Sequence, residues 1–205
     1  MTKRIQHSTF NSVQDANLLI RQHSTRKGFT LVEVLVSIGI FTVLTGVVLS
    51  NYRGYNTNAL FANASEDIVL ALRQAQVYGV GVKGTGTSFT TPYGVYFSTV
   101  AAKKNEIVIF ADTNGNRIYN PLAGETAVET IKWNSTTAVS TITCDGVPCG
   151  NNVYVTFKRP NPDAFVATVA NQAISVGKLD VVLNDSNTGK TSTISITSTG
   201  QISLQ

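Results

Sequence analysis

The sequence predicts an α+β protein in which one long N-terminal helix packs on an antiparallel β-rich globular head. Three observations carry this prediction. An apolar run of 22 residues extends from Phe29 to Ser50, with Glu33 as its single charged residue. An apolar stripe of helical period continues beyond it to about Gly79. After Gly86 the pattern changes to the two-residue period of strands, interrupted by turn residues.

Four segments are expected along the chain. Residues 1–28 form an unstructured leader, 29–50 the transmembrane part of the helix, 51–79 its amphipathic continuation, and 80–205 the head. A helix needs about 20 apolar residues to cross a bilayer, and the apolar run meets that length. A secretory signal peptide has an apolar region of about 7–15 residues and fits less well. A plain signal anchor remains the alternative for this segment.

The second half of the helix is expected to pack on the head through its apolar stripe. The stripe comprises Leu60, Ala64, Ile68, Leu72 and Ala75, with Phe61 and Ala71 beside them. Polar residues fall elsewhere on the helical wheel, namely Ser65, Glu66, Asp67, Arg73 and Gln74. Gly39 and Gly46 lie inside the apolar run, where they allow close helix approach or local unwinding, or are there because glycine is common in membrane helices.

The head is expected to be an antiparallel sandwich or rolled sheet of short strands. The predicted strands are Tyr93–Ser98, Glu106–Ala111, Thr126–Trp133, Thr141–Cys144, Val153–Lys158, Phe165–Ala170, Ile174–Asn184 and Ser192–Leu204. Turn signals such as Asn114-Gly115 and Asp145-Gly146 separate them. Residues 179–197 are expected to form a hairpin.

The charge distribution separates the leader from the rest of the chain. The formal net charge is +4, and residues 1–28 hold five basic side chains against one acidic side chain. Residues 29–205 hold eleven of each sign. The basic excess therefore predicts a cytoplasmic leader under the positive-inside rule. The neutral remainder gives no electrostatic case for binding nucleic acid.

The string RKGFTLVE at residues 26–33 resembles the type III signal of type IV prepilins and type II secretion pseudopilins. The resemblance implies a pilin-like fold and cleavage between Gly28 and Phe29 by a membrane aspartyl peptidase, the prepilin peptidase. It also implies N-methylation of the new N-terminal Phe29. Glu33 matches the family glutamate, which is taken to neutralise the N-terminal amine of a neighbouring subunit during filament assembly. A carboxylate inside a spanning helix costs roughly 2.5–3.5 kcal/mol on insertion scales, which by itself suggests a function.

The head resembles one branch of that family, the GspH/FimT-like minor pilins and pseudopilins. The similar segments are residues 93–97, the Asp/Asn-rich stretch 110–116 with Gly124-Glu125, and the closing strands between Ile194 and Ile202. Some members of the branch bind DNA through an arginine pattern in the last loop. The corresponding residues here, Gly200 to Ser203, contain no arginine, so this chain departs from that pattern.

Two cysteines, Cys144 and Cys149, flank a loop containing Asp, Gly and Pro. This spacing suits a short disulfide in an oxidising compartment; free or reactive thiols are the alternative. No histidine lies near them, so they do not form a zinc site.

Asp112, Asn114 and Asn116 alternate like the first ligands of a calcium loop, with Glu125 as a further carboxylate. The EF-hand pattern places Gly at its sixth position and Glu at its twelfth. Those positions are Arg117 and Ala123 here, and Glu125 comes two residues late. A tight turn without metal is the simpler alternative. We expect no other cofactor.

The sequence favours a structural subunit over an enzyme. Residues 29–205 contain no histidine, so no Ser-His-Asp triad can form there, and no motif pairs two carboxylates for acid–base chemistry. The resemblance implies other pilin or pseudopilin subunits, the prepilin peptidase, an inner-membrane assembly platform and membrane lipid as partners. It places the chain as a single-pass inner-membrane protein with an extracytoplasmic head, and later in a periplasmic or extracellular filament. A filament-tip module that binds DNA, a secreted substrate or a surface is one alternative, and a signal-anchored exported protein is another.

Overall fold

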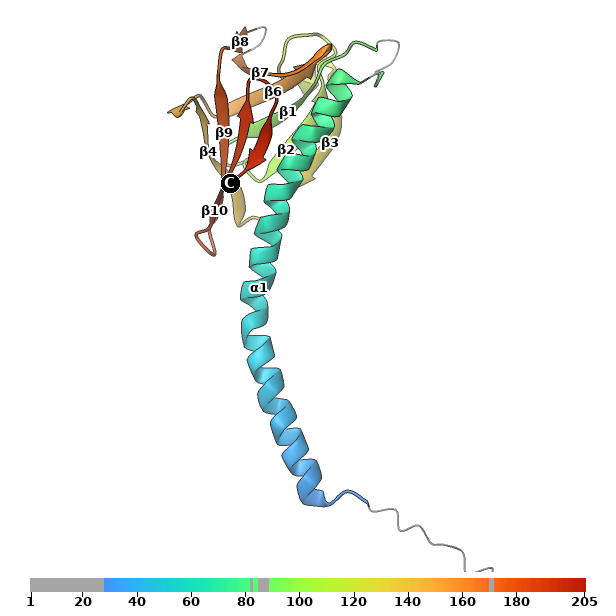
Figure 1. Cartoon of the computed structure of the whole chain (residues 1–205), viewed down its shortest axis with the longest axis vertical. Coiled ribbons are helices and arrows are strands. Elements are labelled where there is room, and N and C mark those ends of the chain that lie inside the picture. The colour runs from blue at the N-terminus through green and yellow to red at the C-terminus, as the bar shows by residue number, and fades with distance from the viewer. Residues whose placement is uncertain (1–27, 82, 85–88, 170–171) are drawn as a thin grey trace, which may run out of the picture. The chain divides into compact units, whose positions relative to one another are not determined.

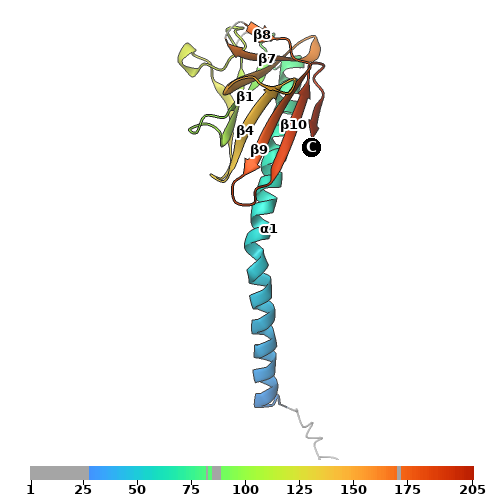
Figure 2. The ribbon, with the colours of Figure 1, turned by 90° about the vertical axis from the view of Figure 1, so that its left-hand side faces the viewer.

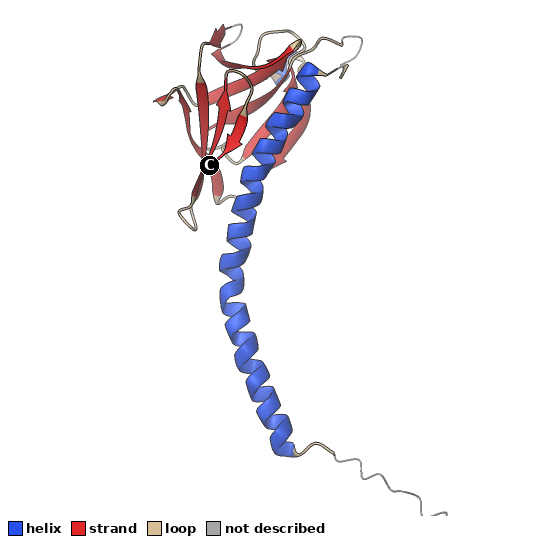
Figure 3. Ribbon diagram, viewed as in Figure 1, coloured by secondary structure: helices blue, strands red, loops and turns tan. Residues whose placement is uncertain are grey.

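The structure, a computed structural model, describes residues 28–81, 83–84, 89–169 and 172–205. The predicted leader, apart from Gly28, lies outside the described residues, so its removal stays a prediction. The chain divides into two units, Met1–Leu49 and Ser50–Gln205, and the long helix α1 (Leu31–Val80) contributes to both. Among the described residues, eleven short strands and a short 3-10 helix, η1 (Pro121–Ala123), follow it. Figures 1 and 3 show how α1 and the strands are arranged. The predicted α+β, pilin-like class is therefore confirmed.

The head contains two antiparallel sheets. The six-stranded sheet has the order β3 (Ala127–Lys132), β2 (Glu106–Ala111), β1 (Tyr93–Ser98), β6 (Asn152–Lys158), β7 (Asn161–Val169), β8 (Gln172–Ile174). The five-stranded sheet has the order β11 (Ile202–Leu204), β10 (Thr191–Thr197), β9 (Lys178–Asp185), β4 (Thr137–Cys144), β5 (Val147–Pro148). Figure 2 shows β4, β9 and β10 side by side.

One hydrophobic core joins the head part of α1 to both sheets. Ile68 and Leu72 of the helix are fully buried in the same cluster as Val95 of β1 and Val181 of β9. Burying a side chain of this size contributes about 1.5–3 kcal/mol. Gly79 allows the helix to come close to β6, because a Cβ there would collide with the carbonyl oxygen of Phe157. The core therefore fixes the last turns of α1 on the head.

The structure corrects the predicted stripe at one end. Leu60 remains 43% exposed, and its neighbour Phe61 is buried instead. Ser65, predicted on the polar side, is also buried, and its hydroxyl donates a hydrogen bond to the carbonyl oxygen of Phe61. A helix turns about 100° per residue, so a strict step of four drifts around the axis, and the buried face shifts by one residue.

The last two predicted strands, Ile174–Asn184 and Ser192–Leu204, are both interrupted in the structure. The chain leaves the six-stranded sheet after β8 at Ile174 and enters the five-stranded sheet with β9 at Lys178. At the C-terminus a turn separates β10 from β11, and Gly200 adopts a φ of 81° in it. Strand β4 begins at Thr137, earlier than predicted, and a register shift between Val139 and Thr141 breaks its two-residue pattern. The predicted hairpin of β9 and β10 is confirmed.

Candidate functional site

The first unit presents an apolar helix surface that nothing in the described chain covers. Phe29 is 82% exposed, and Leu31 and Phe41 are more than two-thirds exposed. An 18-residue window of this part of α1 has a mean hydropathy of 2.3 and is 0% buried, and α1 is the one helix of the described chain long and apolar enough to cross a membrane. Each large apolar side chain contributes roughly 1.5–3 kcal/mol when it leaves water. Contact with lipid or with other apolar helices would therefore be favourable for this surface.

Glu33 occupies the third position of α1. Thr30 precedes the helix, and its hydroxyl oxygen accepts a hydrogen bond from the backbone N–H of Glu33 at 3.2 Å. This is the Thr-x-x-Glu arrangement of a capping box, in which the threonine satisfies an N–H that has no partner in the first turn. A carboxylate here also complements the positive end of the helix dipole. Sequence reasoning missed this structural role, although the spacing of Thr30 and Glu33 was a readable signal.

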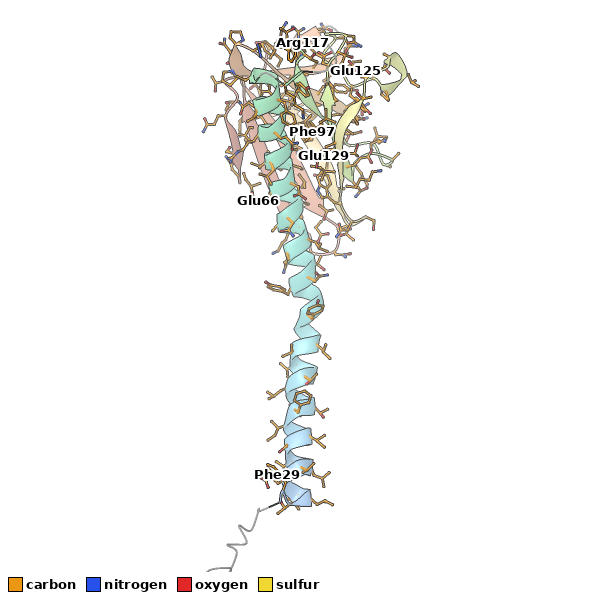
Figure 4. The ribbon with its side chains drawn as sticks, turned by 90° about the vertical axis from the view of Figure 1, so that its right-hand side faces the viewer. Phe29, Glu66, Phe97, Arg117, Glu125 and Glu129 are labelled. Atoms are coloured by element: carbon orange, nitrogen blue, oxygen red, sulfur yellow. A yellow bond between two sulfur atoms is a disulfide. The ribbon has the colours of Figure 1, made fainter. Side chains whose placement is uncertain are left out.

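The predicted cleavage site lies just before the helix. Gly28, Phe29 and Thr30 have no regular secondary structure and are exposed, and α1 begins at Leu31 (Figure 4). A peptidase needs an extended and accessible peptide bond, and the bond between Gly28 and Phe29 lies outside the helix among exposed residues. The geometry is therefore compatible with processing at this bond.

Two hydroxyls inside the apolar part of α1 are satisfied by the helix itself. The hydroxyls of Ser37 and Thr42 donate to the carbonyl oxygens of Glu33 and Ile38, at 2.7 and 2.8 Å. Bilayers tolerate such residues when their hydrogen bonds are made internally. A Cβ at Gly39 would meet nothing within 4 Å of the chain, so this glycine leaves room on the outer surface of the helix.

The second predicted site, in the loop between β2 and β3, is partly assembled. Asp112 and Glu125 are buried, with 1% and 3% exposure, and their carboxyls lie close enough to interact. Asn114 and Asn116 instead use their side-chain oxygens in local turns, accepting from the backbone N–H groups of Asn116 and Ile118. Within the described part of the chain, no group of three or more His, Cys, Asp or Glu side chains is arranged to hold a metal.

The structure joins Cys144 to Cys149 in a disulfide, with 5.5 Å between their Cα atoms. The bridge closes the short β4–β5 hairpin, in which Cys144 pairs with Val147. Asp145 strengthens this corner, because its carboxylate accepts hydrogen bonds from the backbone N–H groups of Gly177 and Lys178. The disulfide is thus a structural clamp at one end of the five-stranded sheet.

An aromatic hollow on the head was not expected from the sequence. Tyr96 and Tyr154 stack with their ring centroids 5.0 Å apart, and Tyr119 lies against Tyr96. These rings line a hollow of about 380 Å³ together with Lys103 and Lys132. Tyr154 is only half-buried. The strand pattern did not predict the hollow, because Tyr119 lies in the loop between β2 and β3 and not in a strand.

Comparison with known proteins agrees with the geometry of the first unit. The family described as "Prokaryotic N-terminal methylation motif" matches residues 23–49. The chain is 28% identical over 117 residues to a "Probable minor fimbrial protein" of Dichelobacter nodosus, an alignment that covers 55% of this chain and 74% of that protein. No protein of known structure shows significant similarity to the chain. The motif match, the similarity to a minor fimbrial protein, the apolar helix and the β-rich head together support the resemblance of the chain to the type IV pilin-like family.

Proposed function

We propose that this chain is a minor pilin or pseudopilin that is made as a precursor and assembled through its N-terminal helix. In this proposal the prepilin peptidase cuts between Gly28 and Phe29, Phe29 is N-methylated, and the subunit enters a type IV pilus or a type II secretion pseudopilus. The observation that carries the proposal is the uncovered apolar surface of α1 with one carboxylate, Glu33, in its first turn.

The chemistry of the new N-terminus explains why a carboxylate is needed there. An α-amine has a pKa near 7.7–8.0 and is largely protonated at neutral pH. Its positive charge would lie at the positive end of the α1 dipole, which is unfavourable. In an apolar filament core the unpaired ammonium and the unpaired Glu33 would both be strongly disfavoured. Pairing the Phe29 amine of one subunit with Glu33 of a neighbour removes both penalties.

The same apolar helix serves two environments in turn. Before assembly its surface lies in the inner membrane, with the basic leader on the cytoplasmic side. After processing, the helices of several subunits pack on one another, and each covers the apolar surface of the next. Transfer from lipid to a helix bundle changes little apolar exposure, so the specific Glu33 pair can decide where a subunit docks.

The test is mass spectrometry of the intact chain and its N-terminal peptide, isolated from membranes of cells that contain the cognate peptidase. We expect a chain that begins with N-methylated Phe29. The same cells without the peptidase serve as the control and should yield residues 1–28 still attached. Retention of the leader in the presence of the peptidase would favour a plain signal anchor and contradict the proposal.

A filament-tip binding module is the second candidate, and the aromatic hollow favours it. Tyr96, Tyr119 and Tyr154 offer flat faces beside two lysines, a combination that suits planar or sugar-like ligands. The last loop lacks the arginines of DNA-binding relatives, so this candidate does not rest on nucleic acid.

A further inference from the structure

We propose that Asp112 and Glu125 form the carboxylate pair of a calcium site in the loop that connects β2 to β3. The inference rests on a buried oxygen of Glu125 that has no hydrogen-bond partner, and it is independent of the proposed assembly function. Figure 4 marks Glu125 and, earlier in the same loop, Arg117.

Glu125 is held rigidly by one of its two carboxylate oxygens. Oε2 accepts a hydrogen bond from the backbone N–H of Asn120 at 2.8 Å. Oε1 is inaccessible to water and has no partner. The backbone N–H of Asn114 also interacts with this carboxyl and lowers its pKa, but Oε1 itself has no hydrogen-bond partner. A buried carboxylate oxygen without a partner is costly, so the site calls for a positively charged occupant.

Asp112 supplies the second carboxylate at the same place. Its Oδ1 accepts from the backbone N–H of Asn116 at 2.9 Å, and its Oδ2 accepts from that of Arg117 at 3.0 Å. Each carboxylate oxygen still has a second lone pair for a cation. Burial raises the pKa of Glu125, and the negative charge of Asp112 raises it further, against the Asn120 hydrogen bond that lowers it. The two carboxyls thus repel each other in the absence of an occupant.

The protein's own cations do not neutralise this pair. Arg117 and Lys158 line a small hollow of about 70 Å³ with Asp112. The Arg117 guanidinium lies over the ring of Phe165, 5.7 Å from its centroid. The ion pairs found among the described residues are Lys103–Glu106, Lys132–Glu106 and Lys178–Asp180, so none of them includes Asp112 or Glu125.

The backbone of the loop makes the sharp turn that calcium loops need. Such loops use glycine at the sixth position because the chain turns there. Arg117 occupies that position and adopts a φ of 66°, so the backbone makes the left-handed turn despite its side chain. Glu125 reaches the start of the loop from two residues beyond the usual position. The carboxylate oxygens of Asp112 and Glu125 are spaced irregularly along the chain. Such oxygen ligands suit the flexible coordination of calcium, whereas magnesium requires a near-ideal octahedron.

The decisive experiment compares calcium binding by the full chain in detergent micelles with that of Glu125→Gln. In the variant the glutamine carbonyl can still accept from Asn120, and its amide can donate toward Asp112, so the fold should be kept. Calorimetric titration with CaCl₂ should give saturable heat for the wild type and none for the variant. Thermal unfolding of the wild type should shift upward by about 3 °C or more at saturating calcium relative to chelator.

Glu129→Gln is the matched control, because it removes an exposed carboxylate only four residues further on. It should keep the calcium response of the wild type. In chelator, Glu125→Gln should be at least as stable as the wild type, since it removes the repulsion with Asp112. No heat and no thermal shift in the wild type would overturn the proposal and leave a carboxyl pair that shares a proton. A calcium response that survives in Glu125→Gln would place the binding elsewhere and equally overturn it.

Discussion

Glu106 illustrates how a single buried charge contributes to the stability of the head. Its side chain is 8% exposed, and its two carboxylate oxygens lie 2.6 Å from the Lys103 ammonium and 2.8 Å from that of Lys132. Burial alone would raise its pKa, but the hydrogen bonds from the two lysines outweigh burial and lower the pKa below the ordinary value of 4.5. The same contact raises the pKa of Lys103.

A lowered carboxyl pKa has a defined consequence for pH dependence. The stabilisation by Glu106 is fully present above the pKa of the unfolded chain, near 4.5, and is lost as the pH falls through the lower pKa of the folded chain. We therefore expect Glu106→Gln to destabilise the head by only about 1–2 kcal/mol at pH 7, because both lysines are exposed and solvent weakens the pair. Below about pH 4 the difference from the wild type should shrink.

Denaturant unfolding in micelles, followed by the fluorescence of Trp133, would measure the loss of stability in Glu106→Gln at pH 7 and below pH 4. Trp133 is the single tryptophan and packs against the core, so it reports on the head. Glu129→Gln, which removes a carboxylate from the exposed strand β3, should change stability little at any pH. A loss for Glu106→Gln that stays constant from pH 7 to pH 3 would show that packing, not charge, is responsible.

At the scale of elements, the contact between α1 and the sheets should carry much of the stability of the head. Leu72 is completely buried, whereas Leu70, two residues earlier on the same helix, is 59% exposed. Leu72→Ala should cost about 2–5 kcal/mol, because it removes buried apolar area and leaves a cavity. Leu70→Ala should stay within about 0.5–1 kcal/mol of the wild type. Equal losses in the two variants, measured by the same denaturant unfolding, would contradict a core that Leu72 fills and Leu70 does not.

The sequence predicted elements well where one local pattern determined them. Strands β1 and β2 begin and end at their predicted residues, Tyr93–Ser98 and Glu106–Ala111, because their apolar runs end at clear turn residues. The chain crossing between β8 and β9 was missed, because Ser175, Val176 and Gly177 do not interrupt the apolar run strongly. Which sheet a strand joins depends on pairing with strands that are distant in the sequence, and the local hydrophobic pattern does not show that pairing.

The pairing of distant strands was equally invisible in the sequence. Strand β1 pairs with β6, and β4 pairs with β9, each across more than 30 residues of chain. The candidate sites likewise differ in whether a local sequence pattern was enough to predict them. The motif around Gly28 and Glu33 lies within eight residues and could be read directly. The partnerless oxygen of Glu125 required the folded loop, since its burial depends on which groups surround it.

At the scale of the whole molecule, the chain combines a head stabilised by its own core with a helix whose apolar surface requires partners. The head buries its large apolar residues in one cluster that α1 shares with both sheets. In the described part of the first unit, residues 28–49, almost no residue is buried. This contrast suits a subunit whose head folds before assembly and whose apolar helix surface is covered by lipid or by other subunits.

Glu33 has both a local role in the helix and a proposed role in assembly. Locally, it stands at the third position of α1, and its backbone N–H donates to the hydroxyl oxygen of Thr30, as in one half of a capping box. In assembly, its charge is proposed to pair with the Phe29 amine of a neighbour. Glutamine suits the third position of a capping box as well as glutamate does, so Glu33→Gln removes the charge and keeps the capping chemistry. Leucine removes the charge and the polar side chain, although the backbone N–H at this position can still donate to Thr30.

We expect Glu33→Gln and Glu33→Leu to be processed and inserted in the membrane but to be depleted severalfold from isolated filaments. Thr30→Ala, which removes the capping hydroxyl and keeps the charge, should enter filaments at close to the wild-type level. Quantitative immunoblotting of sheared filaments against the membrane fraction would measure incorporation, with N-terminal mass spectrometry to verify processing of each variant. Wild-type incorporation of Glu33→Gln together with loss in Glu33→Leu and Thr30→Ala would assign Glu33 to the helix start and remove the charge pair from the assembly mechanism.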